Sequence, residues 1–232
     1  MPNVTENAII PLRSGVDLES PDSPDAQAWR ETLAILAVQP GCVRLATGLQ
    51  VENPDVMQML IEWNSVQDHA NFMAAPAYEP FFNNIKGIMS PTAAPILTHH
   101  TLSAHTSSPD APAPAPVTAS PVTELVSFYF APDFAEADFA EPLQVFADAA
   151  AQHAQGLRAS AHGWSVEKDI EHASLAAAGG KGKVCLLVVG WDSIDAHMAY
   201  RQTDAFRETI GGLRAKASGV EMHHVVFKEY QG

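Results

Sequence analysis

The sequence has few basic residues and a large excess of acidic ones. Thirteen lysines and arginines stand against 27 aspartates and glutamates in 232 residues, which gives a formal net charge of −14. Proteins that bind nucleic acid or anionic membrane surfaces do so largely through lysine and arginine. The charge balance therefore argues against both partners, and it mainly promotes solubility.

Cysteines and long hydrophobic runs are also scarce. The two cysteines, Cys42 and Cys185, lie in apolar stretches, and we expect both to be buried thiols in a reducing compartment. The first residues do not show the basic segment and apolar core of a secretory signal. No apolar run approaches the roughly 18 residues of a membrane span. These absences predict a cytoplasmic location.

Motifs of several common enzyme classes are missing as well. The sequence contains no phosphate-binding glycine loop, no G-x-S-x-G elbow and no paired catalytic carboxylates, which disfavours kinases and common hydrolases. It also lacks C-x-x-C, H-x-H and H-x-x-x-H, spacings at which neighbouring side chains bind one metal ion. We therefore expect neither a metal nor another cofactor.

What the sequence does contain is a repeat. Residues 63–85 and 191–213 align without a gap, and the identical pairs are Trp63/Trp191, Ser65/Ser193, His69/His197 and Ala77/Ala205. A repeat of this length indicates a duplicated domain rather than a solenoid. We expect one domain at residues 1–102 and a second at 122–232. The stretch between them, 103–121, is rich in Pro, Ala and Ser and predicts a linker.

Each repeat shows elements in the order β-α-β-β-α-β. Residues 25–38 carry apolar side chains on one helical face, and residues 134–154 predict the equivalent helix of the second repeat. Ser65 suits the N-cap of the later helix, and Pro76 suits the first position of another helical segment. Residues 169–183 predict a mobile insertion, and residues 184–189 a strand buried on both faces.

Six of the ten histidines form matched pairs between the repeats: His69/His197, His99/His223 and His100/His224. The last two pairs lie on the expected closing strands, at 94–102 and 220–227. Neighbouring residues of a strand point to opposite faces. One histidine of each adjacent pair should therefore face the helices, and neither pair can chelate one ion jointly.

Two β-α-β-β-α-β units with a W-x-S-x-x-x-H helix start after the third strand resemble the dimeric α+β barrel superfamily. Within it, the chain resembles the antibiotic-biosynthesis-monooxygenase-like (ABM) proteins, tandem repeats of fungal type among them. The resemblance covers both repeats and not the linker. It implies an α+β fold of two ferredoxin-like repeats packed sheet to sheet as an intramolecular dimeric α+β barrel, a pseudo-dimer. Further pairing into a homodimer stays open.

The resemblance also implies a function in secondary metabolism. It suggests a cofactor-independent monooxygenase, polyketide cyclase or decarboxylase that acts on an aromatic or polyketide-like small molecule in a pocket between sheet and helices. A non-catalytic small-molecule-binding or stress-response protein of the same fold is the alternative. Haem-degrading members carry a Trp and a His where this chain has Phe72 and Phe82, or Tyr200 and Ile210, so haem ligation is not implied.

A histidine suits the role of general base, because its unperturbed pKa of about 6.5 lies near neutral pH. The candidates are His162, His197 and His69. Where the repeats diverge, the second adds His162 and Trp164 in place of Thr47 and Leu49, which favours His162; the matched histidines suit a structural role equally well. The candidates for a substrate-binding wall are aromatic side chains that core packing also explains: Trp164, Tyr200, Trp191, Trp63, Tyr78 and Phe72.

Overall fold

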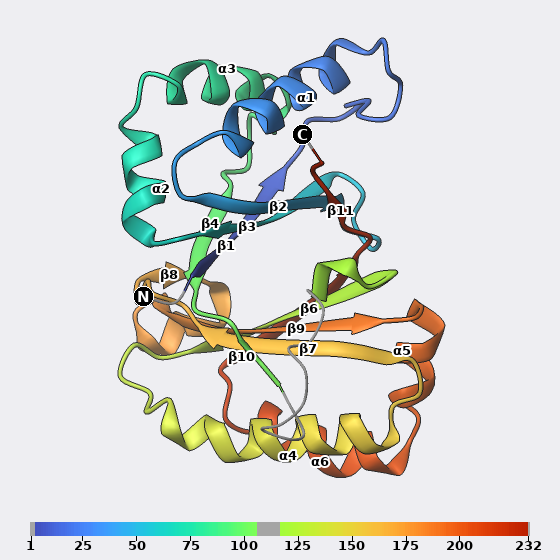
Figure 1. Ribbon diagram of the computed structural model, residues 1–232. Helices are drawn as coiled ribbons and strands as arrows, with labels where there is room; N and C mark the ends of the chain where they lie inside the picture. The colour runs from blue at the N-terminus through green and yellow to red at the C-terminus, as the bar shows by residue number, and fades with distance from the viewer. Residues whose placement is uncertain (1–2, 106–116, 232) are drawn as a thin grey trace. The chain divides into compact units, whose positions relative to one another are not determined.

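The computed structural model describes residues 3–105 and 117–231 of the chain (Figure 1). The chain divides into two compact units. Unit 1 comprises Met1–His99 and Lys228–Gly232, and unit 2 comprises His100–Phe227. Most of the stretch predicted as a linker, residues 106–116, lies outside the described residues.

Unit 1 is an antiparallel sheet with helices on one face. Its elements are β1 (Val4–Pro11), α1 (Pro24–Ala37), β2 (Cys42–Leu49), β3 (Val56–Trp63), α2 (Val66–Met73), α3 (Tyr78–Ile88), β4 (Ile96–His100) and, from the end of the chain, β11 (Lys228–Glu229). The strand order is β11-β2-β3-β1-β4. Helices α1 and α3 contact each other over the sheet (Figure 1).

Unit 2 repeats this plan. Its elements are β5 (Ser103–Ala104), η1 (Val117–Ala119), β6 (Val122–Phe130), α4 (Ala137–His153), β7 (Leu157–Trp164), β8 (Ile170–Glu171), η2 (Ala173–Ala178), β9 (Lys181–Trp191), α5 (Ile194–Tyr200), α6 (Asp204–Arg214) and β10 (Gly219–Val225). The sheet order is β10-β6-β9-β7-β5, with β8 paired to β9. The four main strands follow the same order in both units, which confirms an α+β fold of two ferredoxin-like repeats.

The helix starts follow from the sequence. Ser23 caps α1 by accepting a hydrogen bond from the amide of Asp25. The serines expected to cap the repeated helix do so in both units: Ser65 accepts from the amide of Asp68, and Ser193 from that of Ala196. Because the cap fixes where α2 and α5 begin, it also fixes which way the histidine in the first turns of each helix points.

Two local predictions were wrong. Pro76 lies in a turn, and α3 begins only at Tyr78 after Ala77 as N-cap. The insertion expected to be mobile has regular structure instead. Strand β8 pairs with β9, and η2 buries Leu175 in a small cluster with Tyr129 and Val184. Strand pairing, the burial of Leu175 and the stacking of His172 on Tyr129 together hold the loop to the sheet.

Each unit has its own apolar core between sheet and helices. Strand β9 is buried from Gly182 to Trp191, as its unbroken apolar sequence predicts. Cys185 is buried, and burial raises the pKa of its thiol to about 12. Cys42 is half-buried, with its thiol pKa raised to about 11 by burial and by Glu6. Neither cysteine forms a disulfide.

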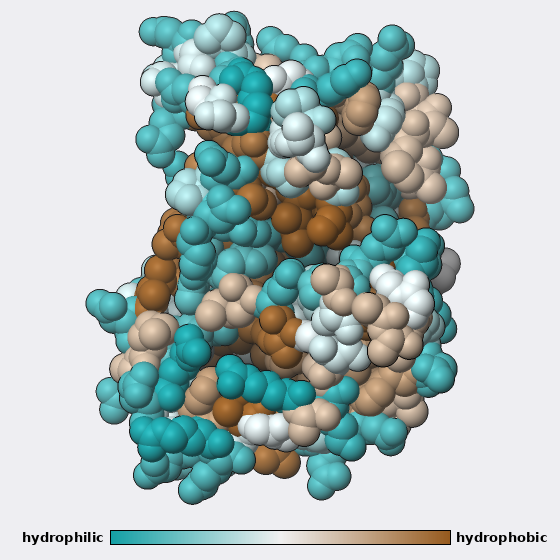
Figure 2. Space-filling model, turned by 180° about the vertical axis from the view of Figure 1, so that it is seen from behind, coloured by the Kyte–Doolittle hydropathy of each residue, from teal (hydrophilic) through white to brown (hydrophobic). Residues whose placement is uncertain are grey.

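Hydrophilic side chains cover much of the face shown in Figure 2, with groups of apolar side chains between them. Among the helices of the described residues, none is both long and apolar enough to cross a membrane.

Candidate functional site

A glutamate, a tryptophan and two histidines meet at the equivalent place in each unit. The glutamate comes from the first strand of the repeat, the tryptophan from the end of the third strand, and the histidines from the following helix and the closing strand. The sets are Glu6, Trp63, His69 and His99 in unit 1, and Glu124, Trp191, His197 and His224 in unit 2. All eight side chains are buried.

In unit 1 the polar contacts converge on one ring nitrogen. His69 Nδ1 lies 2.8 Å from His99 Nε2 and 3.5 Å from Glu6 Oε2. The same Glu6 oxygen accepts a 2.8 Å hydrogen bond from Trp63 Nε1. The indole stacks on the His69 ring, with centroids 5.2 Å apart. Trp63 therefore fixes both the carboxylate and the imidazole.

In unit 2 the same residue types form a chain. His197 Nδ1 lies 2.8 Å from His224 Nε2, but Glu124 Oε1 approaches the other ring nitrogen, Nε2, at 3.4 Å. Trp191 Nε1 donates a 3.0 Å hydrogen bond to Glu124 Oε2 and stacks on the His197 ring. His197 thus connects Glu124 on one side to His224 on the other.

These contacts correct the alignment of the histidine pairs. The sequence matched His99 with His223, but the partner of His197 is His224, which is therefore the true counterpart of His99. Because side chains alternate along a strand, an error of one residue exchanges the two faces. The prediction that one histidine of each pair faces the helices is confirmed for His99 and His224.

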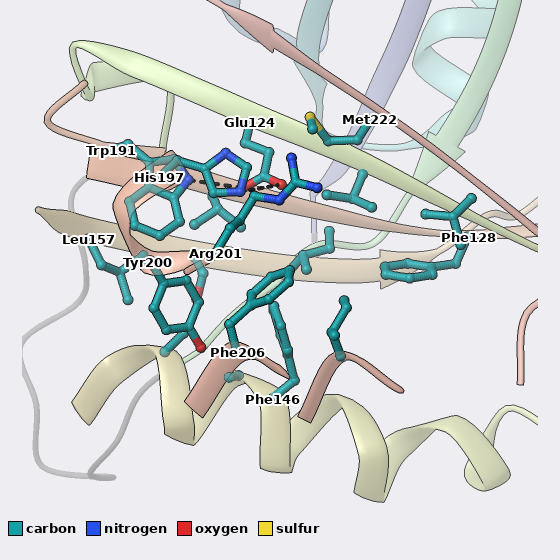
Figure 3. Close-up of a pocket in the computed structure, with 18 of the residues that line it drawn as sticks. Glu124, Phe128, Phe146, Leu157, Trp191, His197, Tyr200, Arg201, Phe206 and Met222 are labelled. Atoms are coloured by element: carbon teal, nitrogen blue, oxygen red, sulfur yellow. Dashed lines mark hydrogen bonds and ion pairs between the residues drawn. The ribbon is translucent and has the colours of Figure 1, made fainter. Parts of the chain in front are cut away.

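Next to the unit 2 cluster is a pocket between the sheet and helices α4, α5 and α6 (Figure 3). It encloses about 760 Å³ outside protein atoms, its open mouth included. Glu124, Trp191 and His197 line its inner end. Most of the other walls are apolar, among them Phe146, Phe206 and the side chains of β6 and β9. The pocket therefore suits a largely apolar molecule that meets a few polar groups.

Tyr200, at the end of α5, lines this pocket. Its hydroxyl is buried and makes no hydrogen bond of acceptable geometry. Burial raises the pKa of Tyr200 to about 12, and the nearby Thr209 hydroxyl opposes this only in part. The phenol therefore stays protonated at neutral pH, and its hydroxyl lies on the helix side, away from Glu124 and His197 (Figure 3).

Two arginines line the same pocket. Arg201 follows α5 and projects into the pocket in Figure 3, with its guanidinium carbon 5.9 Å from the Phe206 ring centroid. Arg214, at the end of α6, lies at the exposed rim. An arginine beside an aromatic wall attracts anionic or electron-rich planar molecules.

The equivalent pocket of unit 1 is smaller and has no arginine or lysine among its lining residues. It encloses about 530 Å³ by the same measure, and Glu6 and His69 lie at its inner end. Phe72 stands where unit 2 has Tyr200, and Met73 occupies the position of Arg201. Tyr78, Phe81 and Phe82 form a cluster of aromatic rings on its helical wall.

The candidate site residues therefore fall into three places. Trp191, His197 and Tyr200 meet in the unit 2 pocket, and His69, Phe72 and Tyr78 in the unit 1 pocket, where Trp63 lies buried behind His69. His162 and Trp164 lie farther along β7. Trp164 packs against Phe130 and Phe139 with Lys183 5.2 Å from its ring, and half-buried His162 pairs with Ser103 of β5.

The two glutamates were not predicted as site residues from the sequence. The pattern that could have identified them is the alternation of side chains along a strand, which places Val4, Glu6 and Ala8 on one face of β1. A carboxylate on a face that is otherwise apolar is rare in a core, and the same pattern recurs around Glu124. The convergence of the glutamate with the histidines could not be read from spacing, because β1, α2 and β4 are distant in the chain.

Comparisons with known proteins show the fold. No family model matches the chain, and no curated protein matches it. Among solved structures, an anthrone oxidase-like protein is 17% identical with a TM-score of 0.68, and the match covers 100% of this chain and 95% of that one. Two proteins provisionally named monooxygenases also match, from Lactobacillus acidophilus (7% identity, TM-score 0.58, 99% and 96% covered) and Fusobacterium nucleatum (10%, 0.60, 98% and 94%).

These likenesses extend over the full chain, so the tandem α+β architecture is shared with monooxygenase-like proteins. At such low identity they show the fold alone. The fungal type of tandem protein has no support among them.

Proposed function

We propose that unit 2 is a cofactor-independent oxygenase site for an acidic aromatic small molecule of the anthrone or polyketide type. The observation that carries the proposal is the composition of one pocket. A buried carboxylate–histidine pair, a phenol donor without a protein partner and an arginine all border the same apolar space.

The Glu124–His197 pair supplies the base. A carboxylate next to an imidazole nitrogen shares a proton readily, and the 3.4 Å contact places the two groups in that relation. His224, 2.8 Å from the other nitrogen of His197, extends the path away from the pocket. A proton taken from a substrate C–H can therefore pass from the pocket into the hydrogen-bonded chain.

Tyr200 supplies the stabilisation of developing negative charge, and Arg201 supplies the attraction for an anionic substrate. Deprotonation of an aromatic ketone develops charge on its oxygen, and a donor aimed at that oxygen lowers the barrier. Tyr200 is a protonated donor at neutral pH and lines the pocket, and Arg201 adds a positive charge to the lining of the same pocket. The apolar walls strengthen both interactions by excluding water.

The reaction balances without a cofactor. The carbanion formed at a CH₂ group donates an electron to O₂, the two radicals combine, and the resulting hydroperoxide loses water to leave a ketone. For one CH₂ group, one O₂ is consumed and one H₂O is formed. The full-length likeness to an anthrone oxidase-like protein supports anthrone as the first probe.

The test is oxygen uptake and quinone absorbance with anthrone and the purified full chain. Glu124→Gln should lower kcat by about 10²- to 10⁴-fold, the usual contribution of a general base. The matched variant, Glu6→Gln in unit 1, should keep the activity. Saturable binding of anthrone without oxygen uptake would instead favour a binding protein of the same fold, and equal loss in both variants would contradict an active site in unit 2.

A further inference from the structure

The unit 1 cluster has a property that its counterpart lacks. One donor atom from each of Glu6, His69 and His99 lies within 4.8 Å of the other two. We propose that these three residues form a binding site for a divalent transition-metal ion, with Zn²⁺ as the representative ion.

The donor set has the right chemistry. Two imidazole nitrogens and one carboxylate oxygen are ligands for Zn²⁺, Fe²⁺ and Co²⁺. The residues Glu6, His69 and His99 are 3%, 6% and 8% exposed, so an ion there would be shielded from bulk water. Buried charged groups in proteins are paired or coordinate metals, and a divalent ion would compensate the Glu6 carboxylate.

The distances are those of one coordination shell. Bonds of about 2.0–2.1 Å from a tetrahedral ion to its ligands place neighbouring donor atoms about 3.3 Å apart. The two separations measured from His69 Nδ1 are 2.8 Å to His99 Nε2 and 3.5 Å to Glu6 Oε2, one on each side of that value. Both partners approach the same nitrogen, so the three donors converge on one region.

Unit 2 carries the same residue types in a different arrangement. Glu124 approaches His197 at Nε2, whereas His224 approaches it at Nδ1. An imidazole cannot direct both nitrogens at one ion, so these three side chains do not converge. The difference predicts one metal site per chain rather than two.

The surroundings complete the site. Trp63 Nε1 donates to Glu6 Oε2 and thereby orients the carboxylate, the role that outer-shell partners play at metal sites. Glu6 and His69 line the unit 1 pocket, which gives an ion a path of entry and leaves room for a fourth ligand. That ligand would be water or a small molecule held in the pocket.

The test is calorimetric titration of Zn²⁺ into tag-free, chelator-treated full-length protein. We expect one ion per chain. His99→Ala should weaken binding by at least the roughly 10- to 100-fold that loss of an outer-shell partner costs, whereas the matched His224→Ala should not change it. Trp63→Phe should weaken binding about 10-fold, and Trp191→Phe should have no effect.

Cobalt provides a readout that needs no variant. Co²⁺ bound by nitrogen and oxygen donors in a tetrahedral site gives intense visible absorption, and it should quench the fluorescence of Trp63, which stacks on His69. Far-UV circular dichroism checks that each variant folds, and His99→Gln replaces His99→Ala if the latter does not.

Three results would overturn the proposal. The first is no stoichiometric Zn²⁺ or Co²⁺ binding by the wild-type chain, which would leave a hydrogen-bonded cluster only. The second is binding that survives both His99→Ala and Glu6→Gln, which would place the ion on other histidines. The third is two equivalent sites, one of them lost in His224→Ala. Each result is independent of the anthrone reaction, which is assigned to unit 2.

Discussion

The two units place the same four residue types at the same point of the same fold, yet they arrange them differently. In unit 1 the carboxylate and the second histidine meet one nitrogen of His69. In unit 2 they occupy opposite nitrogens of His197. In the first arrangement the donor atoms surround one position, which suits a metal ion. In the second arrangement His197 connects Glu124 to His224, which suits proton transfer. A change in which nitrogen faces the glutamate is enough to separate the two chemistries.

The pockets beside the two clusters also differ in the polarity of the side chains at equivalent positions. Unit 2 has Tyr200 and Arg201 where unit 1 has Phe72 and Met73. Both substitutions add a polar side chain to the lining of the unit 2 pocket, at the end of the helix that the repeated serine caps. The duplicated scaffold is therefore kept, while an arginine lines the pocket in unit 2 and not in unit 1. Exchanging residues between the copies is the direct way to test this division.

The largest effect is expected from the histidine at the centre of each cluster. His197→Ala removes the connection between Glu124 and His224 and should reduce anthrone turnover by about 10²- to 10⁴-fold. His69→Ala should leave turnover within a few-fold and should abolish Zn²⁺ binding instead. Steady-state kinetics and calorimetry on both variants give the two readouts. If His69→Ala lost the turnover, the assignment of roles to the units would be reversed.

The next effect concerns recognition of charge. Arg201→Met gives unit 2 the residue of unit 1 and should raise KM for an anionic substrate about tenfold, with a smaller change in kcat, because a cation at the pocket contributes mainly to binding. The reciprocal change, Met73→Arg, serves as the matched control for added charge. A fall in kcat alone, with KM unchanged, would show that Arg201 does not act in binding.

The sequence predicted the architecture better than the site. Duplication, element order and the serine caps all follow from local patterns, and each was confirmed. The site depends on contacts between residues far apart in the chain, such as Glu6 with His69 and His99. The repeat also gave the wrong partner for His99, since a one-residue difference between the closing strands is invisible without the register of the sheet.

Divergence between the copies singled out residues that lie in two different places. It indicated Tyr200, which lines the unit 2 pocket, together with His162 and Trp164, which lie farther along β7. Sequence alone cannot tell whether a divergent residue lies at the pocket end of a strand or beyond it. That depends on where the helices cover the sheet.

A smaller effect is expected from the hydroxyl of Tyr200. Tyr200→Phe gives unit 2 the side chain of Phe72 and removes a buried donor without a hydrogen bond, so it should stabilise the fold by about 1 kcal/mol while slowing turnover. In a chain of this size the gain corresponds to a rise in Tm of about 2–4 °C. Phe72→Tyr should have the opposite effect on stability. A loss of stability in Tyr200→Phe would mean that the hydroxyl is satisfied in the folded protein.

The smallest effect is expected in the pH dependence of stability. It arises from His162, whose counterpart in unit 1 is Thr47. Burial, and to a lesser degree the nearby His105, lowers the pKa of His162 below its ordinary value of 6.5. The unfolded chain therefore takes up a proton near pH 6.5, and the folded chain only at lower pH. Stability from the neutral ring is fully present above pH 6.5 and is lost as the pH falls through the folded pKa.

His162→Thr should accordingly reduce the loss of unfolding free energy between pH 7.5 and pH 5, measured by urea denaturation at both values. The variant lacks this one ionisable group, so the difference between the two chains reports on His162 and its coupling to His105. His162→Gln, which keeps a polar side chain of similar size, should show the same reduced acid sensitivity. An unchanged pH dependence in both variants would mean that the ring is as easily protonated in the folded chain as in the unfolded one.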